Sequence, residues 1–171
     1  MGDLMKTFEI NDRVIYRTRG VCIIVDVVKK TFSGMEEKEY YVCESVSGDH
    51  YRSYVPIGSD TAAQMKYVPS PEEIDRMIDE AFSAEHEYLT DKKARETYYS
   101  EAQKRSDEVE LIRIYAMLAE RRRRLPKMPA ADIRMMSFIE KVIDEEFAYS
   151  LGIERSEVEA YIKNRLNAEC S

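Results

Sequence analysis

The sequence predicts an α+β protein in which a small antiparallel sheet or barrel comes first and a bundle of about five helices follows. Short runs rich in β-branched and aromatic residues, separated by turn residues, fill the first 70 positions. Beyond them, apolar residues recur every three or four positions, as in helices with one buried face. A chain of 171 residues is long enough for two small cores. We therefore expect two domains, residues 1–68 and residues 69–171.

Four strands are expected in the first domain, at residues 14–16, 21–30, 38–46 and 51–55. Gly20 marks a sharp bend between the first two, while Ser33-Gly34 and Gly48-Asp49 mark turns. Pro56 is expected to stop the last strand because it has no N–H to donate. Short strands at this spacing favour a strongly bent sheet or a small barrel.

Five helices are expected in the second domain, and their ends carry clear signals. The first begins at Pro71, with Ser70 as its N-cap and Glu73 three residues after the cap. The other four are expected after residues 90–91 and 106–107, over about residues 129–150 with a C-cap at Gly152, and around residues 158–166.

The net charge of −7 is unevenly distributed along the chain. Residues 1–70 carry 9 basic and 10 acidic side chains, whereas residues 71–171 carry 17 and 23. Proteins that bind nucleic acids non-specifically usually have a basic domain, and neither half is basic. Any contact with DNA is therefore expected from a local basic patch, which must overcome the repulsion between DNA and the acidic rest of the protein.

Membrane and redox features are weak in this sequence. The longest apolar run, residues 21–25, is far shorter than the roughly 20 residues that span a bilayer, and the N-terminus lacks the layout of a secretory signal. Cys22, Cys43 and Cys170 lack the spacing of zinc or redox sites, and the first two lie among strand residues. We expect a cytoplasmic protein without membrane contact.

Catalytic groups are not apparent. The sequence contains no Gly-rich phosphate loop and no nucleophile–base pattern, and we interpret His50 and His86 as ordinary surface residues. The acidic run Asp144-Glu145-Glu146 has two interpretations, a metal site or a solvated helix face, and the second is favoured. We expect no enzyme activity, no catalytic or metal-binding residue, no cofactor and no small-molecule substrate.

Two basic clusters are the candidates for contact with DNA. Arg121–Arg124 lie at the expected C-terminal end of a helix, where they can complement the helix dipole or bind phosphates. Lys92, Lys93 and Arg95 form a second cluster. The predicted DNA-binding residues are Lys92, Lys93, Arg95, Arg121, Arg122, Arg123 and Arg124.

Tyrosines are frequent in the expected sheet, at positions 40, 41, 51 and 54. A small sheet cannot bury both of its faces, so some of these aromatic rings are expected on a surface that binds a partner.

The strand segments resemble the CarD/CdnL family of bacterial transcription regulators, and the same module is similar to the polymerase-interacting domain of the transcription-repair coupling factor. The resemblance rests on Phe8-Glu9-Ile10-Asn11-Asp12-Arg13-Val14-Ile15-Tyr16, Gly20-Val21, Lys38-Glu39-Tyr40-Tyr41-Val42 and Tyr54-Val55-Pro56. It implies a Tudor-like β-barrel followed by about five helices. It further implies that the barrel binds the β subunit of RNA polymerase, and that the helical domain contacts promoter DNA at the upstream edge of the bubble and stabilises the open complex.

When this sequence is matched to the family position by position, the family's polymerase contacts correspond to Lys30, Phe32, Ser53 and Tyr54. The family often has a basic residue where Tyr54 stands, and Arg52 can supply that charge if no bulge separates the two.

The chain departs from the family at a tryptophan that many members insert into the minor groove, because Lys92 takes its place here. Tyr88, Tyr98 and Tyr99 are the nearest aromatic substitutes. Two functions therefore remain open: a regulator that bridges polymerase and promoter DNA, and a protein–protein adaptor without DNA contact.

Overall fold

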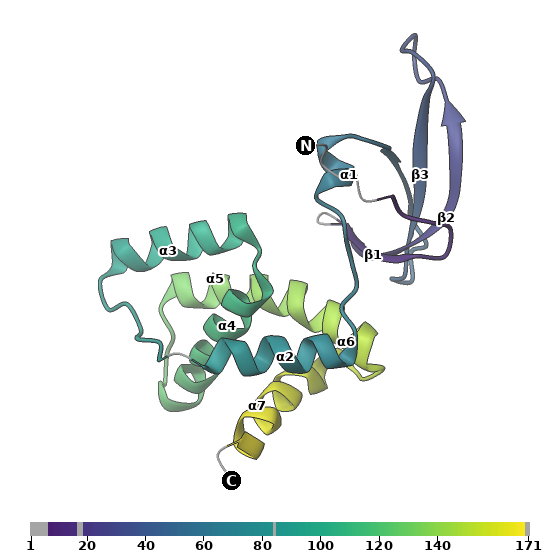
Figure 1. The fold of residues 1–171 in the computed structure, drawn as a ribbon. Coiled ribbons are helices and arrows are strands. Elements are labelled where there is room, and N and C mark those ends of the chain that lie inside the picture. Colours follow the sequence, from purple (N-terminus) through teal and green to yellow (C-terminus); the bar gives the residue numbers. More distant parts are fainter. Residues whose placement is uncertain (1–6, 17–18, 84, 170–171) are drawn as a thin grey trace. The chain divides into compact units, whose positions relative to one another are not determined.

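The computed structural model describes residues 7–16, 19–83 and 85–169, which fall into two compact units, Met1–Val68 and Pro69–Ser171 (Figure 1). The first unit contains a sheet and the second contains helices, so the expected α+β class is confirmed. Within the described residues, no helix combines the length and the apolar character needed to cross a bilayer.

The first unit is a five-stranded antiparallel sheet with the order β4-β3-β2-β1-β5. Its strands are β1 (Arg13–Tyr16), β2 (Gly20–Lys30), β3 (Lys38–Ser45), β4 (Arg52–Pro56) and β5 (Lys66–Tyr67). The two-residue β5 and the short helix α1 (Asp60–Ala63) were not expected from the sequence. Since β4 and β5 are the edges of the described sheet and do not pair, the expected barrel is open, and the term applies only loosely.

The sheet bends where the sequence interrupts its strands. Gly20 has a φ of 72° at the start of β2, in agreement with the expected sharp bend, and the pairing of β2 with β3 shifts between Ile24 and Asp26. The core on the concave side contains Phe8, Val14, Cys22, Ile24, Tyr41, Cys43, Val55, Ala62 and Met65. Burial raises the pKa of the Cys43 thiol to about 12, so this cysteine acts as a core residue. Cys170 lies outside the described residues.

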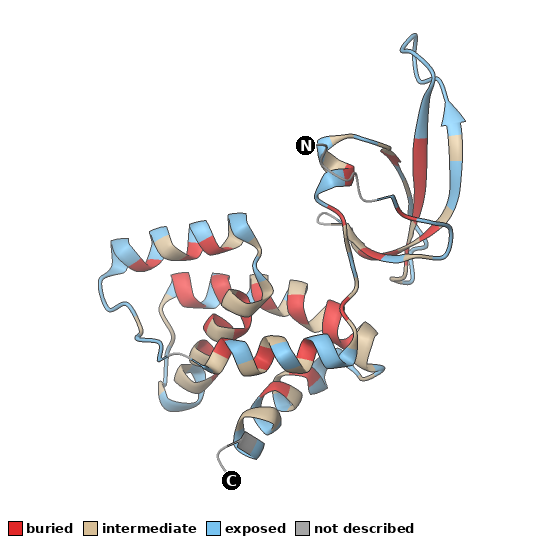
Figure 2. Ribbon diagram, in the orientation of Figure 1, coloured by how far each residue is buried: buried red, intermediate tan, exposed pale blue. Residues whose placement is uncertain are grey.

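The second unit consists of long helices packed around one core (Figure 2). Its elements are α2 (Pro71–Phe82), α3 (Lys92–Arg105), α4 (Glu108–Arg124), α5 (Ala130–Ile139), the π-helical turn η1 (Glu140–Asp144), α6 (Glu145–Leu151), the 3₁₀ turn η2 (Arg155–Glu157) and α7 (Val158–Glu169). Because α5, η1 and α6 follow one another without a break, the described part of this unit agrees with the expected bundle of about five helices.

Local signals place the ends of these helices. The Ser70 hydroxyl accepts from the Glu73 N–H at 3.2 Å, and the Glu73 carboxylate accepts from the Ser70 N–H at 2.7 Å, which completes the expected capping box. Asp91 and Asp107 cap α3 and α4 through their side chains. Gly152 ends α6 with a φ of 66°, as expected for a left-handed C-cap.

Candidate functional site

The convex side of the sheet carries a small group of aromatic side chains. Residues of β4 pair with β3 one by one, Tyr54 opposite Val42 and Arg52 opposite Glu44, with no bulge between them. Because strand residues alternate between faces, Arg52 and Tyr54 lie on the same side of the sheet. Since no bulge separates the two residues, Arg52 can supply the positive charge that the family often has at the position of Tyr54.

Four side chains on this side form what we call the aromatic face: Lys30, Phe32, Tyr40 and Tyr54. The ring of Phe32 stands edge-on to Tyr40, with centroids 5.2 Å apart, and to Tyr54, with centroids 5.9 Å apart. Lys30 Nζ lies 4.2 Å from the ring centroid of Tyr54 and donates a hydrogen bond to its hydroxyl at 3.1 Å. The structure thus brings together Lys30, Phe32 and Tyr54, three residues that were proposed to contact the same partner.

The residues of the aromatic face differ in exposure. Phe32 and Tyr54 are each 40% exposed, whereas Tyr40 is 7% exposed. The buried ring of Tyr40 packs against the ring of Phe32. The expected turn after β2 presents Phe32, since Ser33 and Gly34 both have positive φ and the Met35 N–H donates to the Phe32 carbonyl at 3.0 Å. Tyr40 was not among the predicted contact residues, because its supporting role depends on pairing between strands.

Arg52 lies on the same side of the sheet as the aromatic face, whereas Ser53 lies on the opposite side. Arg52 Nε donates to Glu44 Oε2 at 2.7 Å, and this hydrogen bond raises the pKa of the exposed guanidinium. Ser53 pairs with Cys43, a core residue, so alternation turns Ser53 to the concave side. The side chain of Ser53 therefore does not join that of Tyr54 in the aromatic face.

The cluster of Lys92, Lys93 and Arg95 is divided by burial. The two lysines are exposed in the first turn of α3. Arg95 is buried: its Nε lies 3.0 Å from Asp132 Oδ1, and its Nη1 donates to the Leu89 carbonyl at 2.8 Å. The expectation of one basic patch is corrected accordingly, because the Arg95 guanidinium does not reach the surface.

Each of the arginines Arg121–Arg124 lies next to a carboxylate or an aromatic ring. Arg122 pairs with Glu140 and Glu159, while Arg123 and Arg124 lie 3.6 Å and 2.6 Å from Glu120. Arg121 lies over the ring of Tyr88 at 3.5 Å. A phosphate that approaches this cluster competes with carboxylates already in place, which weakens the cluster as an anion site.

A buried carboxylate that the sequence did not reveal ties several of these residues together. Asp132, in the first turn of α5, is fully buried and accepts from Tyr88 Oη at 2.8 Å and Tyr99 Oη at 3.2 Å. Arg95 supplies the opposing charge, and Arg121 lies 3.9 Å away. Burial, together with this carboxylate, raises the pKa of Tyr88 and Tyr99. Since both hydroxyls are engaged inside the unit, neither tyrosine projects as a substitute for the family's tryptophan.

The remaining polar candidates also have defined places. His50 and His86 are exposed, in agreement with their interpretation. The acidic run is not a solvated face throughout, since Glu146 is buried and Asp144 accepts from Tyr115 Oη at 3.0 Å. Among the described residues, no three His, Cys, Asp or Glu side chains gather as metal ligands.

Comparison with protein families matches residues 8–66 to the CarD-like/TRCF RID domain. The match begins at Phe8, in the core of the first unit, and includes β1 to β4 and α1, hence the whole aromatic face. A search of curated proteins found no match for the chain.

Proposed function

Residues 8–66 form a CarD-like RNA polymerase-interacting domain, and from this premise we propose that the chain binds the polymerase β subunit through the aromatic face. The domain points to a transcription factor that interacts with RNA polymerase. The β subunit as the partner, and Lys30, Phe32, Arg52 and Tyr54 as the contacts, are the finer parts of the proposal. Ser53 is left out because it turns to the concave side.

The observation that carries the proposal is the packing of two exposed rings around one lysine. Aromatic residues dominate the binding energy of many protein interfaces. Phe32 and Tyr54 support each other, and Lys30 holds Tyr54, so these side chains lose little further freedom on binding. Such preorganisation favours a role as the centre of an interface. The proposed role is accordingly binding rather than catalysis.

A second part of the proposal concerns promoter DNA. Lys92 and Lys93 are exposed at the N-terminal end of α3 and can contact phosphates. In this version of the function, the helical unit contacts DNA near the upstream edge of the transcription bubble and stabilises the open complex, with Arg121–Arg124 as further contacts.

The alternative is a protein–protein adaptor that binds polymerase or another partner without DNA contact. Specific observations favour it: Arg95 is buried against Asp132, and three of the four consecutive arginines already pair with glutamates. Residues 71–171 also carry an excess of six acidic side chains. Long-range repulsion from DNA follows from that charge.

Polymerase binding is tested by biolayer interferometry on immobilised bacterial RNA polymerase with the full chain. Phe32→Ala and Tyr54→Ala are each expected to weaken binding about tenfold or more, as for central aromatic residues of an interface. Tyr51→Ala is the matched control, since Tyr51 is an exposed tyrosine of the same unit outside the aromatic face. Equal effects of all three variants would refute the assignment of the face.

DNA contact is tested separately on polymerase–promoter complexes at several salt concentrations. If the helical unit bridges to DNA, the paired change Lys92→Glu, Lys93→Glu reduces both the affinity for the complex and its salt dependence. Lys141→Glu, Lys163→Glu, a paired change of two exposed lysines outside α3, is the control. An adaptor shows the same affinity for polymerase with and without promoter DNA, and the paired change has no effect on it.

A further inference from the structure

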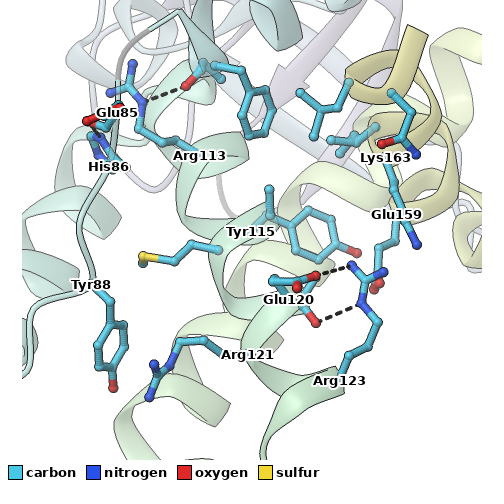
Figure 3. Close-up of a pocket in the computed structure, with 18 residues that line it drawn as sticks. Glu85, His86, Tyr88, Arg113, Tyr115, Glu120, Arg121, Arg123, Glu159 and Lys163 are labelled. Carbon is cyan, nitrogen blue, oxygen red and sulfur yellow. Dashed lines mark hydrogen bonds and ion pairs between the residues drawn. The ribbon is translucent and has the colours of Figure 1, made fainter. Parts of the chain in front are cut away.

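The helical unit contains a cavity of about 570 Å³ that has no part in the proposed binding of polymerase. It is lined by the C-terminal end of α2, the segment that follows it, and residues of α4 and α7 (Figure 3). Its volume lies within the range of roughly 300–1,000 Å³ that is common for small-molecule sites.

The inner lining of the cavity is apolar because two helices turn their periodic apolar residues towards it. Met117 from α4 and Leu166 from α7 line it together with Phe82 from the end of α2, and all three pack on the outside of the helical core. Ala81 and Ala116 bring no side chain beyond Cβ, so the space between these larger residues stays open. The lining therefore offers a continuous apolar surface to a ligand.

The polar part of the lining has an excess of positive charge. Two of its carboxylates are already paired with arginines, Glu120 with Arg123 and Arg124, and Glu159 with Arg122. Arg113 Nε donates to the Ala81 carbonyl at 2.9 Å, and no described carboxylate lies within ion-pair distance of Arg113 or Lys163.

Apart from these paired groups, the lining contains three cations, Arg113, Arg121 and Lys163, and one carboxylate, Glu85. Arg121 is in part balanced by Asp132, 3.9 Å away. Arg113 and Lys163 lie on opposite sides of the cavity, and Arg113 already donates to the Ala81 carbonyl, which leaves Lys163 as the main candidate for pairing with an anionic head group (Figure 3).

We propose that this cavity binds an amphipathic carboxylate of the medium-chain fatty acid type. The hydrocarbon chain lies along Phe82, Met117 and Leu166, and the carboxylate pairs with Lys163 on the α7 side of the cavity, away from Arg113 (Figure 3). The apolar surface provides most of the affinity, and Lys163 selects for an anion. The proposal is independent of polymerase binding, because it uses only residues of the second unit.

The test is a titration of the full chain with hexanoate, octanoate and decanoate, below their micelle-forming concentrations, followed by NMR of methyl groups. The methyl signals of Met117, Ile162 and Leu166 are expected to shift in a saturable way. Each added methylene is expected to strengthen binding by about fourfold, which corresponds to burial of the chain. Decanol, which has the chain without the charge, is expected to bind more weakly than decanoate.

Variants locate the site. Ala116→Phe fills the cavity and is expected to abolish the shifts. Lys163→Gln, at an exposed position that does not endanger folding, is expected to weaken decanoate binding about two- to fivefold and to leave decanol binding unchanged. Lys141→Gln removes an exposed lysine outside the cavity and is expected to have no effect.

Three outcomes overturn the proposal: no saturable shifts with decanoate, equal affinities for decanoate and decanol, or the same decanoate affinity in Ala116→Phe as in the unchanged chain. A fourth is binding of an acidic amphipathic peptide at these methyl groups when decanoate does not bind, which would assign the cavity to a protein partner.

Discussion

Lys30 and Tyr54 lie 24 positions apart in the chain, yet the lysine Nζ is 3.1 Å from the tyrosine hydroxyl and 4.2 Å from the centre of its ring. One side chain thus makes both a hydrogen bond and a cation–π contact with its partner. The two strands that carry them, β2 and β4, are separated by β3. Lys30 therefore reaches across a strand to hold the ring in place.

Lys30→Met tests whether this contact prepares the aromatic face for binding. Methionine keeps most of the aliphatic chain but removes the charge and the donor, so Tyr54 gains freedom that it must lose again on binding. We expect the affinity for RNA polymerase to fall about threefold to tenfold, measured by biolayer interferometry. The free energy of unfolding is expected to change by less than about 0.5 kcal/mol, since the site is exposed.

Lys29→Met is the matched control for that experiment. Lys29 is the neighbouring exposed lysine, pairs with Glu39 at 3.9 Å and projects to the other side of β2. If both variants lose affinity equally, total charge rather than the contact with Tyr54 explains the effect.

Asp132→Asn is expected to destabilise the helical unit by about 3 kcal/mol. The change leaves the buried Arg95 guanidinium without its carboxylate, and breaking a buried ion pair from one side is costly. The measurement is urea unfolding followed by helical circular dichroism, which reports mainly on the second unit. Glu96→Gln, at an exposed site 3.8 Å from Arg134, is the control and is expected to cost less than about 0.5 kcal/mol. A loss that is equally small in both variants would contradict a structural role for the buried pair.

Asp144 predicts an unusual dependence of stability on pH. Burial raises the pKa of its carboxyl group to about 6, and the nearby Glu140 and Glu159 act in the same direction, whereas Tyr115 and Arg155 oppose them. A pKa that is higher in the folded state means that the folded state binds the proton more tightly. The contribution of Asp144 to stability is therefore greatest below about pH 4 and is lost as pH rises through about 6.

Asp144→Asn removes this titration and keeps an oxygen that accepts from Tyr115. At pH 7.5 the variant is expected to be more stable than the unchanged chain by about 2 kcal/mol, and the difference is expected to shrink as the pH falls towards 4. Urea unfolding by helical circular dichroism at both pH values measures it. A variant that is less stable at pH 7.5, or a difference independent of pH, would rule out the raised pKa.

Helix ends and strand positions could be predicted because their signals are local. The capping box of Ser70 and Glu73, the caps at Asp91 and Asp107, and the left-handed Gly152 each depend on residues within one turn. The short β5 could not be predicted, because two residues show no periodicity and their pairing with β1 is a tertiary contact.

Residues of the candidate site could be predicted only where this sequence could be matched to the family position by position. Lys30, Phe32 and Tyr54 converge as expected, whereas Ser53 faces away because strand alternation separates neighbours. Arg95 was placed in a surface patch because a polar helix does not show which of its charges is buried. Its partner Asp132 lies 37 positions further along the chain, so no local pattern reveals the pair.

Gly34 lies in the turn that presents Phe32, and Gly48 lies in the turn between β3 and β4, which makes it a matched control. A Cβ added at Gly34 or at Gly48 would meet no atom within 4 Å, so neither Gly34→Ala nor Gly48→Ala creates a clash. Only Gly34 has a positive φ, of 77°, which costs an L-residue about 1–2 kcal/mol. We expect faster hydrogen–deuterium exchange along residues 20–45 and weaker polymerase binding for Gly34→Ala. Gly48→Ala is expected to be neutral or slightly stabilising, because alanine restricts the unfolded chain. Equal exchange in the two variants would mean that backbone strain at the turn does not control the position of Phe32.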